Sequence, residues 1–114
     1  MPFIQAQLSL KIDENQKNEL QVKLTDIVSA GFSKPKMYIM TEIEDEKTIF
    51  MGGNKLEKAS YINISLLGSA SKSACQNITK SICEVLNKDF GIEGNNVYIT
   101  YHPVDLWGWN GMMF

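Results

Sequence analysis

The residue with the clearest chemical potential is Pro2, which follows Met1 and opens a strand-like segment reaching Leu8. Removal of Met1 turns the Pro2 nitrogen into a secondary amine fixed at the start of a strand. An apolar pocket and a neighbouring cation both disfavour the protonated amine, so the nitrogen could act as a general base near neutral pH. The alternative is purely structural, because proline is well tolerated as the first residue of a strand.

The composition indicates a single globular domain spanning residues 1–114. The chain is 44% hydrophobic, which is enough for one core, and its net charge is only −2. Because basic residues are not clustered, we expect no nucleic-acid partner. No apolar run approaches the roughly 20 residues of a membrane span, so we expect no membrane insertion. The N-terminal segment lacks the pattern of a secretory signal peptide, which favours a cytoplasmic location.

The two cysteines do not indicate a disulfide or a metal site. Cys75 and Cys83 lie on one predicted helix, about 12 Å apart at 1.5 Å per residue. A disulfide needs Cα atoms within about 7 Å. His102 is the only histidine and there is no Cys-x-x-Cys motif. We therefore expect no metal and no cofactor.

The first half of the chain reads as a strand, a helix and a second strand. Residues 2–8 form the first strand. Asp13 is a plausible N-cap of the helix, and Gly31 is expected to end it. The next strand is expected over 37–43, with a short strand near 49–50 in the loop that follows.

The second half repeats this pattern. A strand is expected over 60–66, then a helix capped by Ser69 or Ser71 and ended by Gly91, then a strand over 97–101. Two such halves predict an internal repeat of two βαβ units. The expected fold is α+β, with one four-stranded mixed sheet and both helices on one face.

The two halves can be aligned residue against residue. Phe3 aligns with Tyr61 at a spacing of 58, and Tyr38 aligns with Tyr98 at a spacing of 60. Two helices leave one sheet face uncovered, and such a partly apolar face is usually buried against another subunit. The apolar C-terminal segment 106–114 also favours an oligomer, since tryptophan is costly to expose.

Several motifs in this order resemble the tautomerase superfamily, and within it the macrophage migration inhibitory factor family. The resemblance covers the whole chain. Each motif is weak alone, but their order and spacing together are specific. They are Pro2, Lys34-Pro35, Tyr38-Ile39, Phe50 with Gly52-Gly53, Gly68, Val97-Tyr98-Ile99, and Trp109-Asn110 with Phe114.

The resemblance implies a homotrimer with active sites at the three subunit interfaces. Pro2 would be the catalytic base. Lys34 would be the cation beside that base and would also bind the substrate carboxylate, which the Leu67 backbone would contact as well. On base rates alone, Lys34 before Pro35 is a solvated turn residue.

The resemblance also implies residues that the neighbouring subunit would supply. These are Tyr98 and Thr100. Thr100 stands where the family commonly has asparagine, but its hydroxyl can still donate a hydrogen bond. The apolar walls would be Phe3, Tyr38, Trp107 and Trp109. Tyr98 and the tryptophans could instead be plain core or interface aromatics, and His102 a surface loop residue.

The implied activity is that of a keto–enol tautomerase, an isomerase of the phenylpyruvate or dopachrome type. Its substrate would be a small aromatic keto or enol compound. The resemblance further implies a cytokine-like signalling role, export without a signal peptide and a cell-surface receptor on the host. The alternative is a secreted cytokine mimic, or a trimeric binding protein whose pocket is catalytically vestigial.

Overall fold

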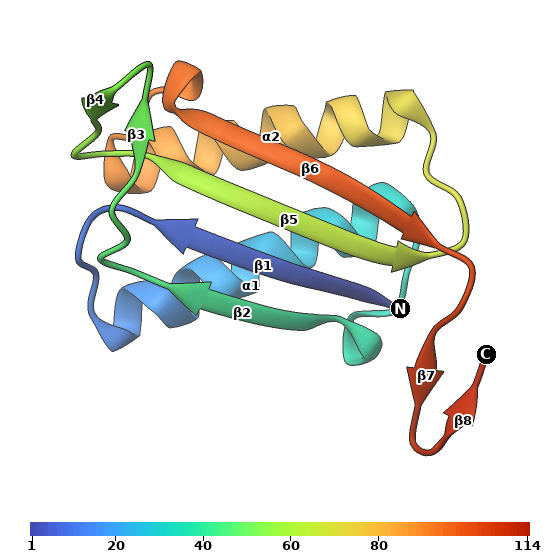
Figure 1. Ribbon diagram of the computed structural model, residues 1–114. Coiled ribbons are helices and arrows are strands. Elements are labelled where there is room, and N and C mark those ends of the chain that lie inside the picture. The colour runs from blue at the N-terminus through green and yellow to red at the C-terminus, as the bar shows by residue number, and fades with distance from the viewer.

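The computed structural model describes all 114 residues and contains one four-stranded mixed sheet with two helices on one face (Figure 1). The strands are β1 (Pro2–Leu8), β2 (Met40–Glu44), β5 (Ser60–Leu67) and β6 (Val97–Val104). Their order in the sheet is β2-β1-β5-β6. β1 runs parallel to β2 and antiparallel to β5, and β5 runs parallel to β6. The predicted fold is therefore confirmed.

The two helices, α1 (Glu14–Phe32) and α2 (Lys72–Phe90), begin at side-chain caps. The Asp13 carboxylate accepts a hydrogen bond from the Gln16 N–H at 2.8 Å, and the Gln16 side chain accepts one from the Asp13 N–H at 2.9 Å. This reciprocal pair satisfies two backbone donors that a helix start leaves free. Ser71, rather than Ser69, caps α2 by accepting from the Ala74 N–H at 3.1 Å.

The prediction that Gly31 ends the first helix is wrong. The helix continues to Phe32, and Ser33 adopts the left-handed conformation with φ 54°. Gly31 instead lies where the two helices meet, because a Cβ built on it would lie 2.4 Å from Ile78 Cγ1. The second helix ends as predicted, with Gly91 at φ 69°.

The second strand begins three residues later than predicted, because Lys36–Tyr38 forms a short 3₁₀ turn, η1. Its equivalent in the second half is η2 (Gly94–Asn96). Phe3 pairs with Met40, and Tyr61 pairs with Tyr98. The alignment of Tyr38 with Tyr98 is therefore wrong. Met40 is the counterpart of Tyr98, so the repeat keeps one spacing, 98 − 40 = 58.

Two short hairpins complete the structure. One pairs β3 (Phe50–Met51) with β4 (Asn54–Lys55) and replaces the single short strand expected near residue 50. The other pairs β7 (Gly108–Trp109) with β8 (Met112–Met113). β6 itself extends three residues beyond the predicted end. The chain then leaves the sheet, and the C-terminal hairpin stands beside the end where β1 begins (Figure 1).

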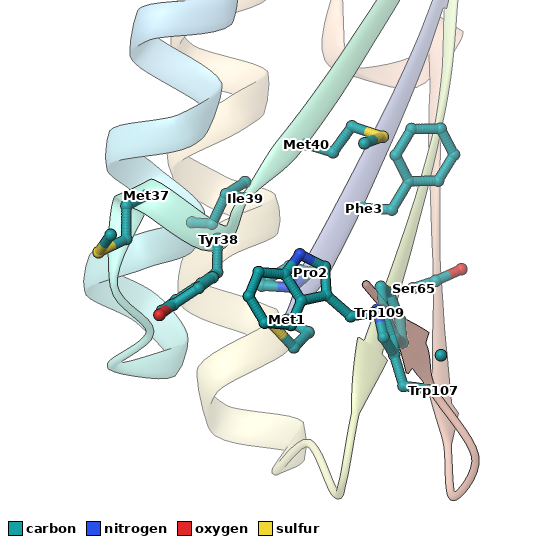
Figure 2. A pocket seen from close by; sticks show the side chains of 11 residues that line it. Met1, Pro2, Phe3, Met37, Tyr38, Ile39, Met40, Ser65, Trp107 and Trp109 are labelled. Carbon is teal, nitrogen blue, oxygen red and sulfur yellow. The ribbon is translucent and has the colours of Figure 1, made fainter. Parts of the chain in front are cut away.

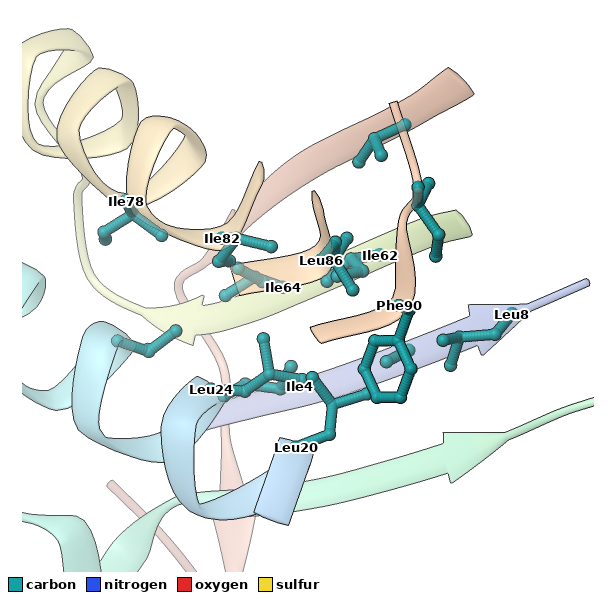
Figure 3. Close-up of a cluster of buried hydrophobic side chains, with 14 of the residues drawn as sticks. Ile4, Leu8, Leu20, Leu24, Ile62, Ile64, Ile78, Ile82, Leu86 and Phe90 are labelled. Atoms are coloured by element: carbon teal, nitrogen blue, oxygen red, sulfur yellow. The ribbon is translucent and has the colours of Figure 1, made fainter. Parts of the chain in front are cut away.

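The core lies between the sheet and the helices. Alternate residues of β1 and β5 point towards the helices and are fully buried, as the period of two in a strand requires. Helical side chains close over them (Figure 3). The central members of this cluster are Ile4, Leu20, Leu24, Ile62, Ile82 and Leu86.

No helix covers the opposite face of the sheet (Figure 1). Polar side chains dominate it: the Gln5 amide donates to Glu42 at 3.0 Å, and the Tyr61 and Thr100 hydroxyls lie 2.7 Å apart. The side-chain oxygen of Asn63 is buried there without a hydrogen-bond partner. We call this surface the open sheet face. Neither helix has the apolar length needed to cross a membrane.

Candidate functional site

A pocket of about 790 Å³ opens where β1 begins, between the η1 turn and the C-terminal hairpin (Figure 2). Eight of its eleven lining residues are hydrophobic. A largely apolar cavity of this size suits a small aromatic molecule. The lining includes Pro2, Phe3, Tyr38, Trp107 and Trp109, five of the residues singled out in the sequence.

Pro2 is fixed at this pocket by the sheet. It is buried, and it lies opposite Leu66 in the pairing of β1 with β5. Met1 precedes it and also lines the pocket. Burial, and after it the positive charge of Lys34, lowers the pKa of the Met1 amino group below its ordinary value. The site therefore favours a neutral amine at the start of this strand.

Lys34 supplies a cation close to that amine. Its side chain is half-buried and takes part in none of the five ion pairs of the chain. Lys36, two residues further on, is instead neutralised by Asp26 at 2.8 Å. Lys34 does not itself line the pocket, but it is an unpaired positive charge near the amine that does, which suits an anionic group on a bound molecule.

Aromatic side chains form one wall of the pocket. The Tyr38 and Trp109 rings meet edge to face with centroids 5.9 Å apart, and Trp109 stacks on Phe114 at 5.8 Å. The Phe114 N–H donates to the Trp107 carbonyl at 3.1 Å, which holds the hairpin together. The C-terminal segment therefore builds the wall, and Phe114 supports it from behind.

Five lining residues besides Met1 were missed as site residues from the sequence: Met37, Ile39, Met40, Ser65 and Gly108. A signal existed for Ser65, because it lies on the same sheet face as Phe3 and pairs with it. No comparable signal existed for Met37, since it belongs to η1, a turn that the sequence analysis treated as a strand.

Four predicted site residues are not among those that line the pocket: Lys34, Leu67, Tyr98 and Thr100. Leu67 adjoins Leu66, the partner of Pro2, but does not line the pocket. Tyr98 is 64% exposed and pairs with Tyr61, near the opposite end of the sheet. The Thr100 hydroxyl is hydrogen-bonded to Tyr61 and lies 2.9 Å from His102 Nε2 on the open sheet face.

Comparisons with known proteins agree with this architecture. The family model described as macrophage migration inhibitory factor (MIF) matches residues 1–114. A macrophage migration inhibitory factor from Xenopus tropicalis is 26% identical over 104 residues, which cover 89% of each chain. The crystal structure of Leishmania major MIF2 superimposes with a TM-score of 0.91 at 27% identity, covering 100% of this chain and 97% of that one.

A second solved structure gives the same result. The macrophage migration inhibitory factor-like protein from Entamoeba histolytica has a TM-score of 0.89 at 27% identity, with coverage of 99% and 98%. The fold is that of the tautomerase superfamily. Within it, the chain belongs to the macrophage migration inhibitory factor family.

Proposed function

We propose that the protein is a keto–enol tautomerase that uses the Pro2 nitrogen as its base once Met1 has been removed. The observation that carries the proposal is that Pro2 lies buried at the start of β1 in the lining of an apolar pocket. Support comes from the lowered pKa of the Met1 amino group, caused by burial and by Lys34. Pro2 adjoins that amine and lines the same pocket, so the same two influences act on its nitrogen. A base works best when its pKa lies near the working pH.

The reaction is a proton transfer between carbon and oxygen. The neutral Pro2 nitrogen takes a proton from the carbon next to the ketone of an aryl pyruvate. The electrons of the broken C–H bond form the C=C bond, and the carbonyl π electrons move to oxygen, which takes up a proton from solvent. The Pro2 ammonium then releases its proton to solvent, so the net change is an isomerisation. The reverse path returns the proton from the Pro2 ammonium to carbon.

Lys34 and the aromatic wall hold the substrate for this step. The ammonium group pairs with the substrate carboxylate, and a charge-assisted contact is the strongest one available at this edge of the pocket. Tyr38 and Trp109 pack against the aryl ring and exclude water, with Phe3 and Trp107 lining the remaining wall. Phenylpyruvate and dopachrome-like compounds have this combination of ring and carboxylate.

A homotrimer completes the proposed site. In this assembly Tyr98 and Thr100 come from a neighbouring subunit, and the Leu67 backbone contacts the carboxylate. Support comes from the exposed apolar C-terminal segment, where Leu106 is 78% and Met112 64% exposed. Apolar side chains that are this exposed in one chain are typical of subunit contacts.

The test is an aryl-pyruvate tautomerisation assay on protein whose N-terminus is Pro2, as verified by mass spectrometry. We expect turnover by the wild type and a loss of about 10²-fold or more in Pro2→Gly, which keeps a terminal amine but not the ring. Turnover that is unchanged in Pro2→Gly would exclude Pro2 as the base.

The second candidate is a cytokine-like signalling protein that is exported without a signal peptide, acts through a cell-surface receptor and has a catalytically vestigial pocket. The observation that favours it is the name shared by the family and by its relatives, macrophage migration inhibitory factor. Pro2→Gly separates the two candidates. Signalling that survives in this variant while turnover is lost would show that signalling does not depend on catalysis.

A further inference from the structure

The backbone of Lys34 is held by a single helical residue, Ser29. The Ser29 carbonyl accepts a hydrogen bond from the Lys34 N–H at 3.0 Å, and it also accepts one from the Ser33 N–H that ends the helix. The Ser29 hydroxyl in turn donates to the Lys34 carbonyl. Both backbone polar groups of Lys34 are therefore engaged by one residue.

The second half of the repeat has an equivalent side-chain contact without a lysine, although the Ile92 N–H there donates to the Leu86 carbonyl and not to that of Asn87. Asn87, 58 residues after Ser29, donates from its side chain to the Ile92 carbonyl at 3.3 Å. The Asn87 carbonyl accepts from the Gly91 N–H at 2.9 Å. Ile92 is fully buried in the core, and it occupies the position equivalent to Lys34. The side-chain contact thus holds the backbone of a core residue, Ile92, in the second half and that of the cationic residue Lys34 in the first.

The position of Lys34 matters because no other side chain restrains its charge. It has no ion-pair partner, and the residues on both sides of it, Ser33 and Pro35, are exposed. The ammonium group lowers the pKa of the amine at the start of β1 through its charge. That influence weakens with distance, so it depends on how the backbone of Lys34 is placed.

We propose that Ser29 is a positioning residue of the active site: its hydroxyl fixes the Lys34 backbone so that the ammonium group stays beside the Pro2 nitrogen. This inference rests on the proposed function. Without the hydroxyl, the Lys34 carbonyl loses its contact with the Ser29 side chain of α1, while the Lys36–Asp26 ion pair still joins the turn to α1. The cation then spends less time next to the base, and the Pro2 pKa rises.

The experiment compares Ser29→Ala, Ser29→Thr and Asn87→Ala with the wild type, all with Pro2 as the N-terminus. A lost side-chain hydrogen bond is worth about 1 kcal/mol, so we expect Ser29→Ala to lower kcat/KM about fivefold. The acidic limb of its pH–rate profile should move upwards by about half a unit. Ser29→Thr keeps a hydroxyl and should restore both. Asn87→Ala loses the equivalent bond away from the pocket and should leave the profile in place.

The Pro2 pKa is also followed by NMR titration of the proline nitrogen, which needs no substrate. A higher Pro2 pKa in Ser29→Ala alone supports the inference. An unchanged pKa in Ser29→Ala, or an equal shift in Asn87→Ala, overturns it. If the wild type shows no turnover, the proposed function fails, and the titration still tests whether Ser29 places Lys34 beside Pro2.

Discussion

Ser33 and Gly91 occupy equivalent positions at the ends of the two helices, 58 residues apart, and both adopt the left-handed conformation. Ser33 has φ 54° and ψ 47°, and Gly91 has φ 69° and ψ 21°. Glycine adopts this region without cost, whereas a residue with a Cβ is disfavoured there by about 1–2 kcal/mol. Gly91, in the second half of the repeat, is therefore better suited than Ser33 to end a helix in this conformation.

We expect Ser33→Gly to raise the free energy of unfolding by about 0.5–1 kcal/mol, because it removes the strain of a left-handed serine. Chemical denaturation checks this: the midpoint should rise, while the dependence of the unfolding free energy on denaturant concentration stays the same. The matched variant Gly91→Ala should be destabilising, since its Cβ takes on the same strained conformation and would lie 3.1 Å from Lys58 Nζ. A Ser33→Gly variant less stable than the wild type would contradict this reading.

A second prediction concerns the contact between the helices. Gly31→Ala places a methyl group 2.4 Å from Ile78 Cγ1 and 2.6 Å from Cδ1, inside the core. We expect a loss of about 1–3 kcal/mol from this overpacking. Ile78→Ala removes both Cγ1 and Cδ1, so Gly31→Ala should cost less in an Ile78→Ala background. Equal losses in both backgrounds would show that the two side chains do not clash.

The fold could be predicted from the sequence largely because its signals are local. Each signal has its own physical reason: the alternation of buried residues in β1 and β5, the capping of α1 by Asp13, and the end of α2 at Gly91. Gly31 misled the prediction because glycine has two uses that a sequence does not separate. It can end a helix, or it can let another element approach closely, and here the approach of Ile78 decides.

The site could be predicted in part, for a similar reason. Pro2, Phe3, Tyr38, Trp107 and Trp109 were identified and do line one pocket. Met37, which η1 also places in the lining, was missed because the strand expected over 37–43 begins at this residue, whereas Lys36–Tyr38 forms a 3₁₀ turn. The hydroxyl contact of Ser29 to Lys34 was also out of reach, since it depends on the helix running past Gly31.

The assembly gives a third prediction. Light scattering at micromolar concentration should give a mass about three times the 12.9 kDa of one chain. Leu106→Arg, in the exposed C-terminal segment, should shift the mass towards the monomer. Val22→Arg, on the outer face of α1 and 44% exposed, is the matched control and should leave the mass unchanged. A wild type that remains a monomer would remove the basis for sites shared between subunits.

The role of Lys34 in substrate binding gives a fourth prediction. Lys34→Ala should reduce kcat/KM on phenylpyruvate by about 10–100-fold, since a hydrogen bond to a charged group is worth about 1.5–3 kcal/mol. The methyl ester of the substrate lacks the carboxylate. The loss of kcat/KM on the ester should therefore be smaller and should reflect only the raised pKa of Pro2. Equal losses on the acid and the ester would mean that Lys34 acts through the base alone.

The pH dependence follows from the same charges. The base must be neutral to accept a proton. Burial and then the charge of Lys34 lower the pKa of the Met1 amino group, and we expect both to lower the pKa of the Pro2 nitrogen once Met1 is removed. Activity should therefore rise with pH through that lowered pKa and reach its plateau below the pH at which an ordinary amine loses its proton. In Lys34→Ala this rise should move to higher pH.

The central claim is that the Pro2 nitrogen is the base, and the most direct measurement compares one chain with a blocked and a free Pro2. As an amide behind Met1, the nitrogen has no basic lone pair. We expect protein that retains Met1 to be about 10²–10⁴-fold less active than protein whose N-terminus is Pro2. Mass spectrometry of each preparation alongside the aryl-pyruvate assay supplies the comparison. Equal turnover by the two forms would show that Pro2 only begins a strand, and would contradict the account.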